Sequence, residues 1–290
     1  MPSLAVVSEL LLETQGFPLL QLLSEKLDRS QAAREDPDLA RAAEALGLLT
    51  PSTAGTALTD LGYILANVAK EYCHWVAQGR SMPSPRPPPA LIHSKDVVDI
   101  GCGIGRWLWE FQTTARSVRG VELKPEYIEM GRLLALREGL SPPEIIQGSA
   151  EHIDRLLEPS SADLVFSRLV LNHVPIATTL SKVAAILRPG GVLWAQVESF
   201  RFGLSQCVRG EPRLRSRLLH AFGLVNSLFC MSNHQLAVRT GGRHHDVHST
   251  AYPSLSWWKR AVHRAHLIEW NVVQDDDTLV FFARKPHRPR

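Results

Sequence analysis

Apolar residues follow one pattern in the first part of this chain and another pattern after about residue 90. In the first part they recur at helical spacing, which predicts amphipathic helices over 4–12 and 17–27. Pro37 suits the first turn of a third helix that runs to Ala45, and Gly47 is placed to end it. Two short extended pieces then flank a Pro/Ser/Gly turn within 48–58, and a further helix begins at Thr59 or Asp60.

After residue 90, short apolar runs alternate with helical patterns. We expect strands over 95–100, 117–122, 144–147, 162–167 and 192–199. The intervening helices are expected over 106–114, 125–138, 150–157 and 177–187, and another over 254–266. Strands over 267–274 and 278–283, joined by three aspartates, predict a closing hairpin. Alternating strands and helices predict an α/β fold with a mainly parallel sheet.

A proline-rich stretch separates the two patterns. Five prolines lie within residues 81–89, which favours an extended spacer. We therefore expect a helical domain over 1–85, a linker over 86–94 and an α/β domain over 95–290. Residues 200–250 do not fit the alternating pattern and are expected to form a lid inserted into the second domain.

The stretch from Asp96 to Gly105 has the features of a nucleotide-binding turn. An apolar run ends in glycines at Gly101, Gly103 and Gly105, and a helical pattern follows. Glycine permits a tight turn and lets backbone N–H groups approach a ligand closely. The spacing does not match the Gly-x-Gly-x-x-Gly fingerprint of dehydrogenases, so the turn alone is compatible with several nucleotides.

Two resemblances make the prediction specific. Residues 48–62, with their Leu-Leu-Thr, small turn and Leu-Thr-Asp-Leu-Gly, resemble the N-terminal winged-helix module of small-molecule O-methyltransferases. The order of motifs over about 95–200 resembles the class I S-adenosylmethionine-dependent methyltransferases. Those motifs are the glycine turn, Val121-Glu122, Gly148-Ser-Ala150, Asp163-Leu-Val-Phe166 and Arg188-Pro-Gly-Gly191. The resemblance implies a Rossmann-like, seven-stranded sheet and S-adenosylmethionine as cofactor, with S-adenosylhomocysteine as product.

The second resemblance also implies which residues hold the cofactor. The glycine turn packs against its amino-acid part and ribose, and Asp99 contacts the methionine amine. Glu122, followed by Leu123, ends the second strand, where a carboxylate accepts both ribose hydroxyls. Apart from the resemblance, Asp99 could cap turn amides and Glu122 could be a surface residue.

Four further residues complete the implied cofactor site. Ser149 and Ala150 correspond to the loop that holds adenine, although the family usually has Asp where Ser149 stands. Ser167 and Arg168 follow the fourth strand, where the main chain meets the methionine end.

His173 is the candidate catalytic residue. It follows the fourth strand within Leu169–Pro175, and a neutral imidazole there could take a proton from a hydroxyl or an amine. Winged-helix O-methyltransferases place their general-base histidine one position earlier, where this chain has Asn172. A packing or orienting role for His173 therefore stays open.

Histidines also gather in the lid, where His244, Asp246 and His248 alternate and His245 lies between them. In a strand the alternating residues would share a face, which is compatible with a metal site. A flexible loop that contributes a histidine to the acceptor site explains them equally well, and we assign no metal.

Composition limits the functional classes. Hydrophobic content of 44% and charged content of 21% are typical of a soluble globular protein, and no apolar run is long enough to span a membrane. Four widely spaced cysteines and the absence of a signal peptide favour the cytoplasm. Residues 201–290 hold 14 basic and 6 acidic residues, a net charge of +8. A solvated basic face and an anionic partner both explain that charge. The expected third helix has only one basic residue, Arg41, which argues against DNA binding.

We therefore expect a methyltransferase that acts on an oxygen, or a nitrogen or carbon, of a small molecule in secondary metabolism. The resemblance also implies a homodimer. An RNA- or protein-directed methyltransferase and a non-catalytic winged-helix regulator that senses S-adenosylmethionine are the alternatives. A nicotinamide-dependent oxidoreductase is a more distant one.

Overall fold

The computed structural model describes residues 16–27, 37–52, 55–209, 214–229, 238–239, 247–248, 250–274 and 277–287. The expected helix over 4–12 and residues 244–246 lie outside these ranges. Contacts between residues divide the chain into two compact units. Unit 1 comprises residues 1–86, 103–110 and 124–145, and unit 2 comprises residues 87–102, 111–123 and 146–290.

Unit 1 begins with the helices and the hairpin that the sequence predicts. They are α2 (Gly16–Leu27), α3 (Pro37–Ala45), β1 (Leu49–Ser52), β2 (Gly55–Leu58) and α4 (Asp60–Ala77). Gly47 has a φ of 71°, a left-handed conformation suited to the end of α3. The hydroxyl of Thr59 caps α4 by accepting a hydrogen bond from the N–H of Gly62. The order of elements is the predicted one, and the assignment to a winged helix stays a prediction.

Two later segments of the chain also belong to unit 1. They carry most of α5 (Arg106–Phe111) and all of α6 (Pro125–Arg137). The rings of Trp75 on α4 and Trp109 on α5 pack edge to face, with centroids 5.1 Å apart. Glu138, just after α6, accepts hydrogen bonds from Tyr72 and Arg80. Helix α4 therefore provides packing partners for α5 and α6.

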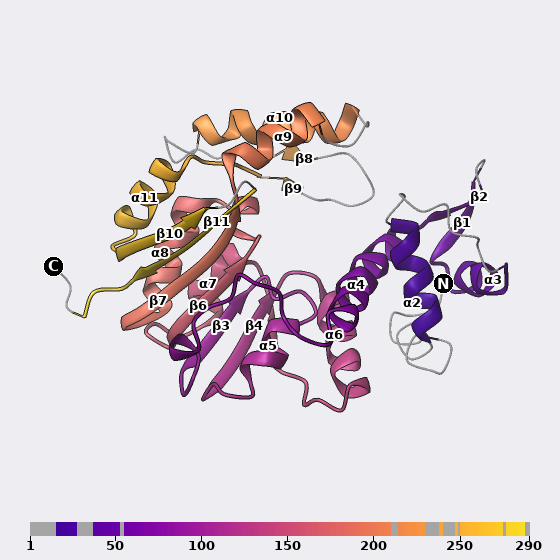
Figure 1. Ribbon diagram of the computed structural model, residues 1–290, viewed down its shortest axis with the longest axis horizontal. Coiled ribbons are helices and arrows are strands. Elements are labelled where there is room, and N and C mark those ends of the chain that lie inside the picture. Colours follow the sequence, from indigo (N-terminus) through magenta and orange to yellow (C-terminus); the bar gives the residue numbers. More distant parts are fainter. Residues whose placement is uncertain are drawn as a thin grey trace. The chain divides into compact units, whose positions relative to one another are not determined.

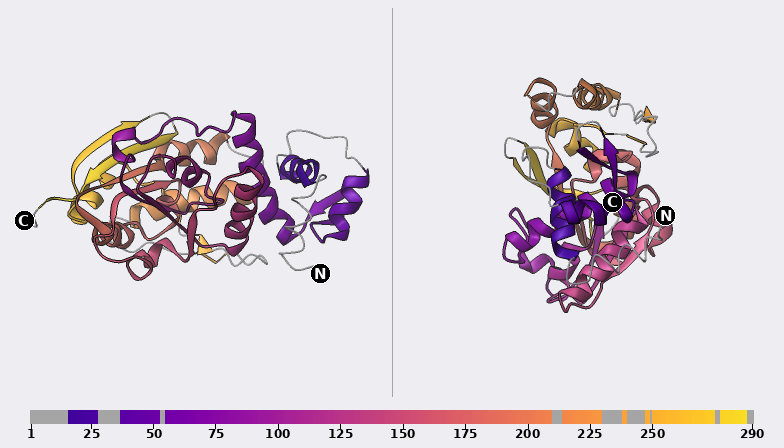
Figure 2. Two further views of the ribbon diagram at one scale, coloured as in Figure 1. Left: turned by 90° about the horizontal axis from the view of Figure 1, so that it is seen from below. Right: turned by 90° about the vertical axis from the view of Figure 1, so that its right-hand side faces the viewer.

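A seven-stranded sheet dominates unit 2. Its order is β10–β11–β7–β6–β3–β4–β5, and Figures 1 and 2 show β10 and β11 in yellow at one edge. The strands are β3 (Asp96–Ile100), β4 (Ser117–Glu122), β5 (Glu144–Gln147), β6 (Ala162–Arg168), β7 (Leu187–Glu198), β10 (Ile268–Gln274) and β11 (Thr278–Arg284). Strands β4, β3, β6 and β7 run parallel, and β11 pairs antiparallel with both β7 and β10. This confirms the Rossmann-like α/β fold with its closing hairpin.

Helices and short turns connect these strands. They are η1 (Pro89–Leu91), η2 (Ala150–His152), α7 (Ile153–Leu156), η3 (Leu171–His173), α8 (Ile176–Ile186), α9 (Phe200–Arg209), α10 (Leu214–Phe229) and α11 (Leu255–Arg264). The core between the sheet and α8 and α11 contains buried Val165, Leu193, Val183, Trp258 and Phe281. Two residues of β8 (Val238–Arg239) pair with two of β9 (Val247–His248).

Two element boundaries differ from the sequence-based prediction. Strand β7 begins at Leu187 rather than at Val192, because Leu187 already pairs with Ala162 of β6. The Arg188-Pro-Gly-Gly191 turn is therefore an irregularity at the start of the strand, with Gly190 at a φ of 81°. Helix α5 ends at Phe111, three residues earlier than expected, before threonines that favour helices weakly.

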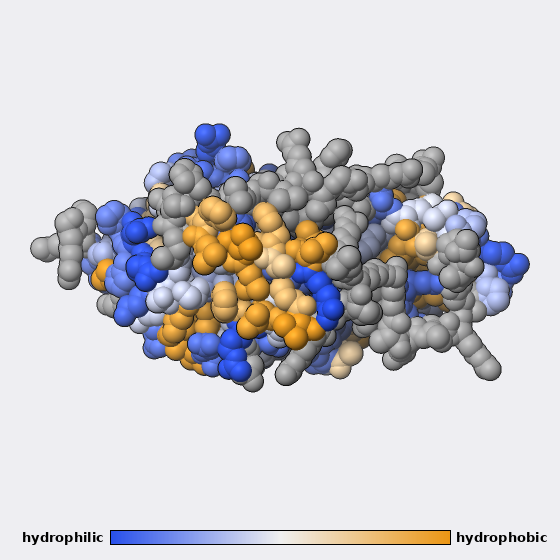
Figure 3. Space-filling view, turned by 90° about the horizontal axis from the view of Figure 1, so that it is seen from above, coloured by the Kyte–Doolittle hydropathy of each residue, from blue (hydrophilic) through white to orange (hydrophobic). Residues whose placement is uncertain are grey.

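Helices α9 and α10 fill most of the predicted lid and lie beyond the carboxyl end of β7 (Figure 1). They carry an exposed set of large apolar side chains, which forms part of the orange surface in Figure 3. Its members are Phe200, Leu204, Val208, Leu218, Val225, Leu228 and Phe229.

An ion-pair network joins the amino ends of four strands. It lies at the other end of the strands from α9, which follows the carboxyl end of β7. Asp96 of β3 pairs with Arg116 before β4 and with Arg188 of β7, each at 2.6 Å. The same two guanidinium groups reach Asp163 of β6 at 2.8 and 3.1 Å. The network therefore links β3, β4, β6 and β7 without involving the carboxyl ends where such sheets bind ligands.

Among the described residues, no helix is long and apolar enough to cross a membrane.

Candidate functional site

The chain makes the predicted tight turn where β3 ends. Gly101, Gly103 and Gly105 have φ values of 68°, 57° and 82°, in the left-handed region that favours glycine. A Cβ atom on Gly101 would lie 2.3 Å from Cγ2 of Val170, so the close approach itself requires glycine there. The N–H groups of Gly101 and Cys102 both donate to the carbonyl of Val121, which fastens the turn to the end of β4.

Two carboxylates stand at the carboxyl ends of neighbouring strands, as predicted. Asp99 is 2% exposed and pairs in register with Gly120 of β4 and Phe166 of β6. Glu122 is the last residue of β4 and is half-buried, and its Oε1 accepts a hydrogen bond from the N–H of Leu123 at 2.8 Å. The side chain of Leu123 is 60% exposed.

The predicted adenine loop follows β5. The N–H of Gly148 donates to the carbonyl of Glu122, which ties this loop to the end of β4. The hydroxyl of Ser149 accepts a hydrogen bond from the N–H of Glu151 and caps the short helix η2. Ala150 is nearly buried. Ser149 thus has a structural role whether or not it also contacts a ligand.

Ser167 and Arg168 end β6, next to β3 and β7. Ser167 is fully buried, and its Oγ has no hydrogen-bond partner among the described residues. Nε of Arg168 donates to Oε1 of Gln196 on β7 at 2.7 Å. Unit 2 therefore brings eight of the predicted residues to the carboxyl ends of its strands: Asp99, Gly101, Glu122, Leu123, Ser149, Ala150, Ser167 and Arg168.

Gly103 and Gly105 belong to unit 1. A Cβ atom on Gly103 would lie 3.1 Å from a carboxylate oxygen of Glu71, and one on Gly105 would lie 3.3 Å from Cδ1 of Ile145. Arg106, which follows the turn, pairs with Glu71 at 3.4 Å. The space beside these two glycines is therefore narrow.

Asn172 and His173 lie in η3, directly after β6. Asn172 is fully buried. Its Oδ1 accepts from the N–H of Glu198 at 2.8 Å, and its Nδ2 donates to the carbonyls of Glu198 and Ala251 at 3.2 and 2.7 Å. One amide thus joins the end of β7 to the segment after the lid.

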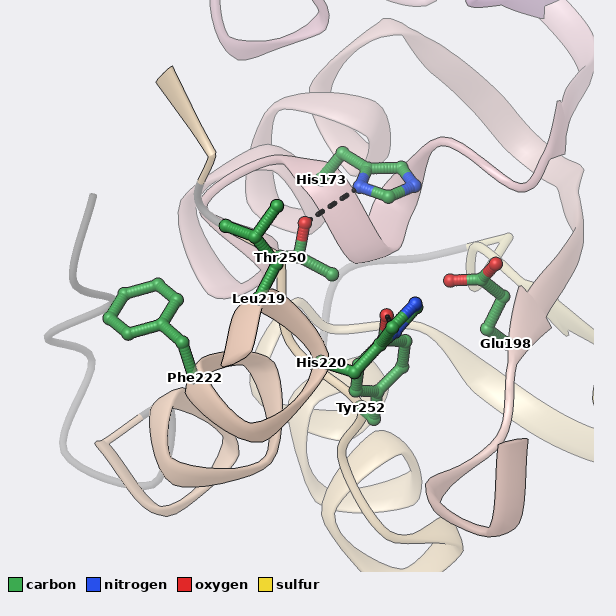
Figure 4. Close-up of a pocket in the computed structure, with 7 residues that line it drawn as sticks. All are labelled: His173, Glu198, Leu219, His220, Phe222, Thr250 and Tyr252. Atoms are coloured by element: carbon green, nitrogen blue, oxygen red, sulfur yellow. Dashed lines mark hydrogen bonds between the residues drawn. The ribbon is translucent and has the colours of Figure 1, made fainter. Parts of the chain in front are cut away.

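His173 lines a pocket in unit 2. Figure 4 shows the pocket with its lining residues His173, Glu198, Leu219, His220, Phe222, Thr250 and Tyr252. Nδ1 of His173 lies 3.0 Å from Oγ1 of Thr250, and the residue is exposed. Polar groups gather on one side of the pocket in Figure 4, and Leu219 and Phe222 of α10 lie on the other.

Glu198 is a pocket residue that the sequence analysis missed. It is the last residue of β7, and its carboxylate points toward the space between His173 and the His220–Tyr252 pair (Figure 4). Its Oε2 is buried and accepts no hydrogen bond from the described residues. Burial raises the pKa of Glu198 to about 7. The available signal was an acid at the end of a buried strand, the rule that selected Asp99 and Glu122.

His220 and Tyr252 form the opposite wall from His173. Nδ1 of His220 lies 2.7 Å from the Tyr252 hydroxyl, and their rings stack with centroids 5.9 Å apart. Burial lowers the pKa of His220, which favours its neutral form. Burial and the nearby carboxylate of Glu198 raise the pKa of Tyr252, which keeps its hydroxyl protonated.

The structure does not bear on the histidine cluster of the lid. His244, His245 and Asp246 lie outside the described residues, and His248 is placed only by its backbone in β9. No group of three or more His, Cys, Asp or Glu side chains that could hold a metal ion occurs in the part of the chain that is described.

Part of this chain matches a known protein family. Residues 98–195 match the family model of a methyltransferase domain. A ubiquinone biosynthesis O-methyltransferase of Xanthomonas euvesicatoria is 32% identical over 99 residues, which cover 34% of this chain and 41% of that protein. A protein of the same name from Nitrosococcus oceani is 31% identical over 105 residues, 35% of this chain and 43% of its own. The chain thus spans about two fifths of the length of these curated relatives.

Similar solved structures share little sequence with the chain. The crystal structure of a putative S-adenosylmethionine-dependent methyltransferase from Listeria monocytogenes has a TM-score of 0.49 and 18% identity. It covers 74% of this chain and 99% of its own. A complex from Haloferax volcanii, of the Trm112 methyltransferase activator with a putative methyltransferase, gives a TM-score of 0.49 and 17% identity, with coverage of 79% and 96%.

The residues at the strand ends fit the cofactor of this family, S-adenosylmethionine. Its charged ammonium and ribose hydroxyls need carboxylates, and Asp99 and Glu122 provide one each at adjacent strand ends. The left-handed Gly101 keeps a side chain away from the turn that follows Asp99. When bound, this cofactor supplies an electrophilic methyl group on a sulfonium.

Proposed function

We propose that this chain, which carries a class I S-adenosylmethionine-dependent methyltransferase domain, moves the methyl group of S-adenosylmethionine to an oxygen of a small molecule. The observation that carries the proposal is the position of the pocket. His173 lies five residues after Arg168, and Glu198 ends the strand next to β6, so the pocket lies at the carboxyl ends of the central strands.

Oxygen is favoured over nitrogen and carbon by two observations. The relatives from Xanthomonas euvesicatoria and Nitrosococcus oceani are named O-methyltransferases. The pocket also contains groups that can accept a proton, Glu198 and His173, and a hydroxyl acceptor must lose its proton during transfer. A nitrogen with a free electron pair would not need such a group.

A small acceptor is supported by the lining of the pocket. Leu219 and Phe222 give it an apolar wall, and the described part of its lining contains no Lys or Arg that would attract a phosphate backbone. Secondary metabolism, a homodimer and a cytoplasmic location complete the proposal. The location is supported by Cys73, Cys102 and Cys207, which form no disulfide among the described residues.

The proposal is tested first by cofactor binding. Isothermal titration calorimetry with S-adenosylhomocysteine should show binding to the wild type and a loss of affinity of at least about tenfold for Glu122→Ala. Glu158→Gln, which changes an exposed acid of the same unit, is the matched control. No binding to the wild type, or equal affinity for Glu122→Ala, would contradict the cofactor assignment.

The second test is transfer itself. Methyl-labelled S-adenosylmethionine should give labelled product with compounds from a panel of small hydroxylated aromatics, amines and thiols. Labelling of the hydroxyl compounds supports the proposal, whereas labelling of RNA or protein alone would favour the alternative substrates.

A further inference from the structure

Glu198 has a fixed position in the wall of the pocket. Both backbone hydrogen-bonding groups of this residue are held by the side-chain amide of Asn172. Pairing of Glu198 with Thr278 of β11 holds the same residue from the other side. Its side chain therefore projects from a rigid strand end rather than from a loop, as precise proton transfer requires.

The surroundings of its carboxylate are poor in compensating charge. Among the described residues, no Lys or Arg lines the pocket, and the titratable groups that line it with Glu198 are His173 from η3, His220 from α10 and Tyr252. The Tyr252 hydroxyl already shares a hydrogen bond with His220. Oε2 of Glu198 is buried and has no hydrogen-bond partner among the described residues. These surroundings favour the neutral, protonated form of the carboxyl over the charged carboxylate.

The other bases of the pocket are less suited to this task. His173 is exposed, and its Nδ1 lies 3.0 Å from the hydroxyl of Thr250. His220 lies against Tyr252, and burial lowers the pKa of its imidazole, which weakens it as a base. Glu198 is the one carboxylate among the lining residues, and its raised pKa of about 7 suits a base that works near neutral pH.

We propose that Glu198 is the general base of the methyl transfer and takes the proton of a hydroxyl group on the acceptor bound in this pocket. The inference rests on the proposed function. As the acceptor oxygen forms its bond to the methyl carbon, its proton passes to the Glu198 carboxylate, the carbon–sulfur bond breaks and its electron pair stays on sulfur. The sulfonium thus becomes a neutral thioether and the carboxylate a neutral acid, which later releases its proton to water. His173 and Thr250 position the acceptor.

The acid–base state of Glu198 can be measured without any acceptor. In the full-length protein labelled with 13C at glutamate carboxyl groups, NMR should show one carboxyl that titrates near pH 7 and is missing from the Glu198→Gln spectrum. If every glutamate of the wild type titrates below about pH 5.5, the inference is overturned.

The catalytic role is tested with two acceptors that differ in acidity, phenol and 4-nitrophenol. Glu198→Gln should lower kcat for phenol by about 10²- to 10⁴-fold. It should affect 4-nitrophenol far less at mildly alkaline pH, because that hydroxyl is already ionised. Glu198→Asp should retain part of the activity, and Glu158→Gln, on the exposed surface, should match the wild type.

Failure of the inference differs from failure of the proposed function. Equal turnover of phenol by Glu198→Gln and the wild type overturns the role of Glu198 alone. A wild type that methylates aniline but neither phenol nor 4-nitrophenol overturns the proposed transfer to oxygen, and the inference with it. Loss of turnover in His173→Gln with full turnover in Glu198→Gln also overturns it. A wild type that does not bind S-adenosylhomocysteine overturns the proposed function. For Glu198→Gln, the affinity for S-adenosylhomocysteine should stay within about twofold of the wild type.

Discussion

The described residues that line the pocket include no Lys or Arg to pair with the carboxylate of Glu198. Burying a carboxylate without such a partner lowers the stability of the folded protein. Folding raises the pKa of Glu198 from 4.5 to about 7, so the folded protein binds this proton more tightly than the unfolded chain does. The free energy of unfolding should therefore fall as the pH rises from about 4.5 to about 7. Residues that are poised for proton transfer commonly carry this kind of cost.

Glu198→Gln should remove this pH dependence, because its neutral amide does not ionise. Relative to the variant, the wild type should lose about 2 kcal/mol of unfolding free energy between about pH 5 and pH 8. Urea denaturation of both proteins at several pH values measures the difference. Two parallel curves would mean that the Glu198 carboxyl is not desolvated.

Asn172 is a buried residue whose contribution is structural. Asn172→Ala should lower the free energy of unfolding by about 2–4 kcal/mol, because it leaves the N–H of Glu198 and the carbonyls of Glu198 and Ala251 without that partner. Urea denaturation compares it with Gln147→Ala, which removes an exposed amide. A loss of less than about 1 kcal/mol would show that water replaces these hydrogen bonds.

At the scale of elements, the amino ends of the strands carry the ion pairs and the carboxyl ends carry the site. The pairing of Asp96 with Arg116, Ser117 and Arg188 holds the pKa of its carboxyl well below its ordinary value of 3.8. This contribution to stability is therefore present above about pH 3.8 and is lost as the pH falls through the lowered pKa.

Asp96→Asn should reduce the free energy of unfolding by about 1–2 kcal/mol at neutral pH and by less in acid or at high salt. Asp154→Asn is the control, since Asp154 makes only an isolated pair with Lys182 at 3.4 Å. Chemical denaturation at neutral and acidic pH, with and without added salt, measures both. Equal effects of the two substitutions would show that linking four strands adds nothing to a simple pair.

Elements with a strong local signal could be predicted from the sequence, and those set by neighbours could not. Strand β4 runs over Ser117–Glu122 as predicted, because Val118 and Val121 precede an acid at its end and a proline-led helix follows. The start of β7 could not be read locally, because Arg188–Gly191 looks like a turn and is extended only through its neighbours β6 and β11.

The same distinction holds for the candidate site. The glycine turn, Asp99 and Glu122 could be predicted because their residue types suit a ligand and their positions follow or end predicted strands. The pocket depends on residues from separate segments, such as His173, His220 and Tyr252, whose meeting no local pattern reveals. Glu198 ends a strand as Glu122 does, but it lies outside the motifs that carry the family resemblance.

At the scale of the molecule, the chain passes between its two units more than once. Trp109 of α5 is 3% exposed because it packs within unit 1, and Arg106 pairs there with Glu71 of α4. The N-terminal helices are thus part of the structure that holds α5 and α6. The linker over 86–94 stays a prediction. It does not imply that residues 95–290 fold independently.

A fragment of residues 87–290 should be less stable than the full chain, because it lacks the α4 partners of α5 and α6. We expect a melting temperature lower by at least about 5 °C, or aggregation, together with increased binding of a dye that detects exposed apolar surface. Scanning calorimetry and dye fluorescence test this. Trp75→Ala in the full chain should shift the melting temperature in the same direction by less, and a fragment that melts with the full chain would contradict the expectation.

The side-chain amide of Asn172 bonds to backbone atoms of Glu198 and Ala251, so these contacts hold the strand end without the side chains of Leu219 and Phe222. Leu219 and Phe222 can therefore be exchanged for residues of other sizes while the strand end keeps its place. A scaffold of this kind can acquire a new acceptor by a few substitutions on α10. Directed evolution of acceptor choice should begin at these two positions and leave Asn172 unchanged.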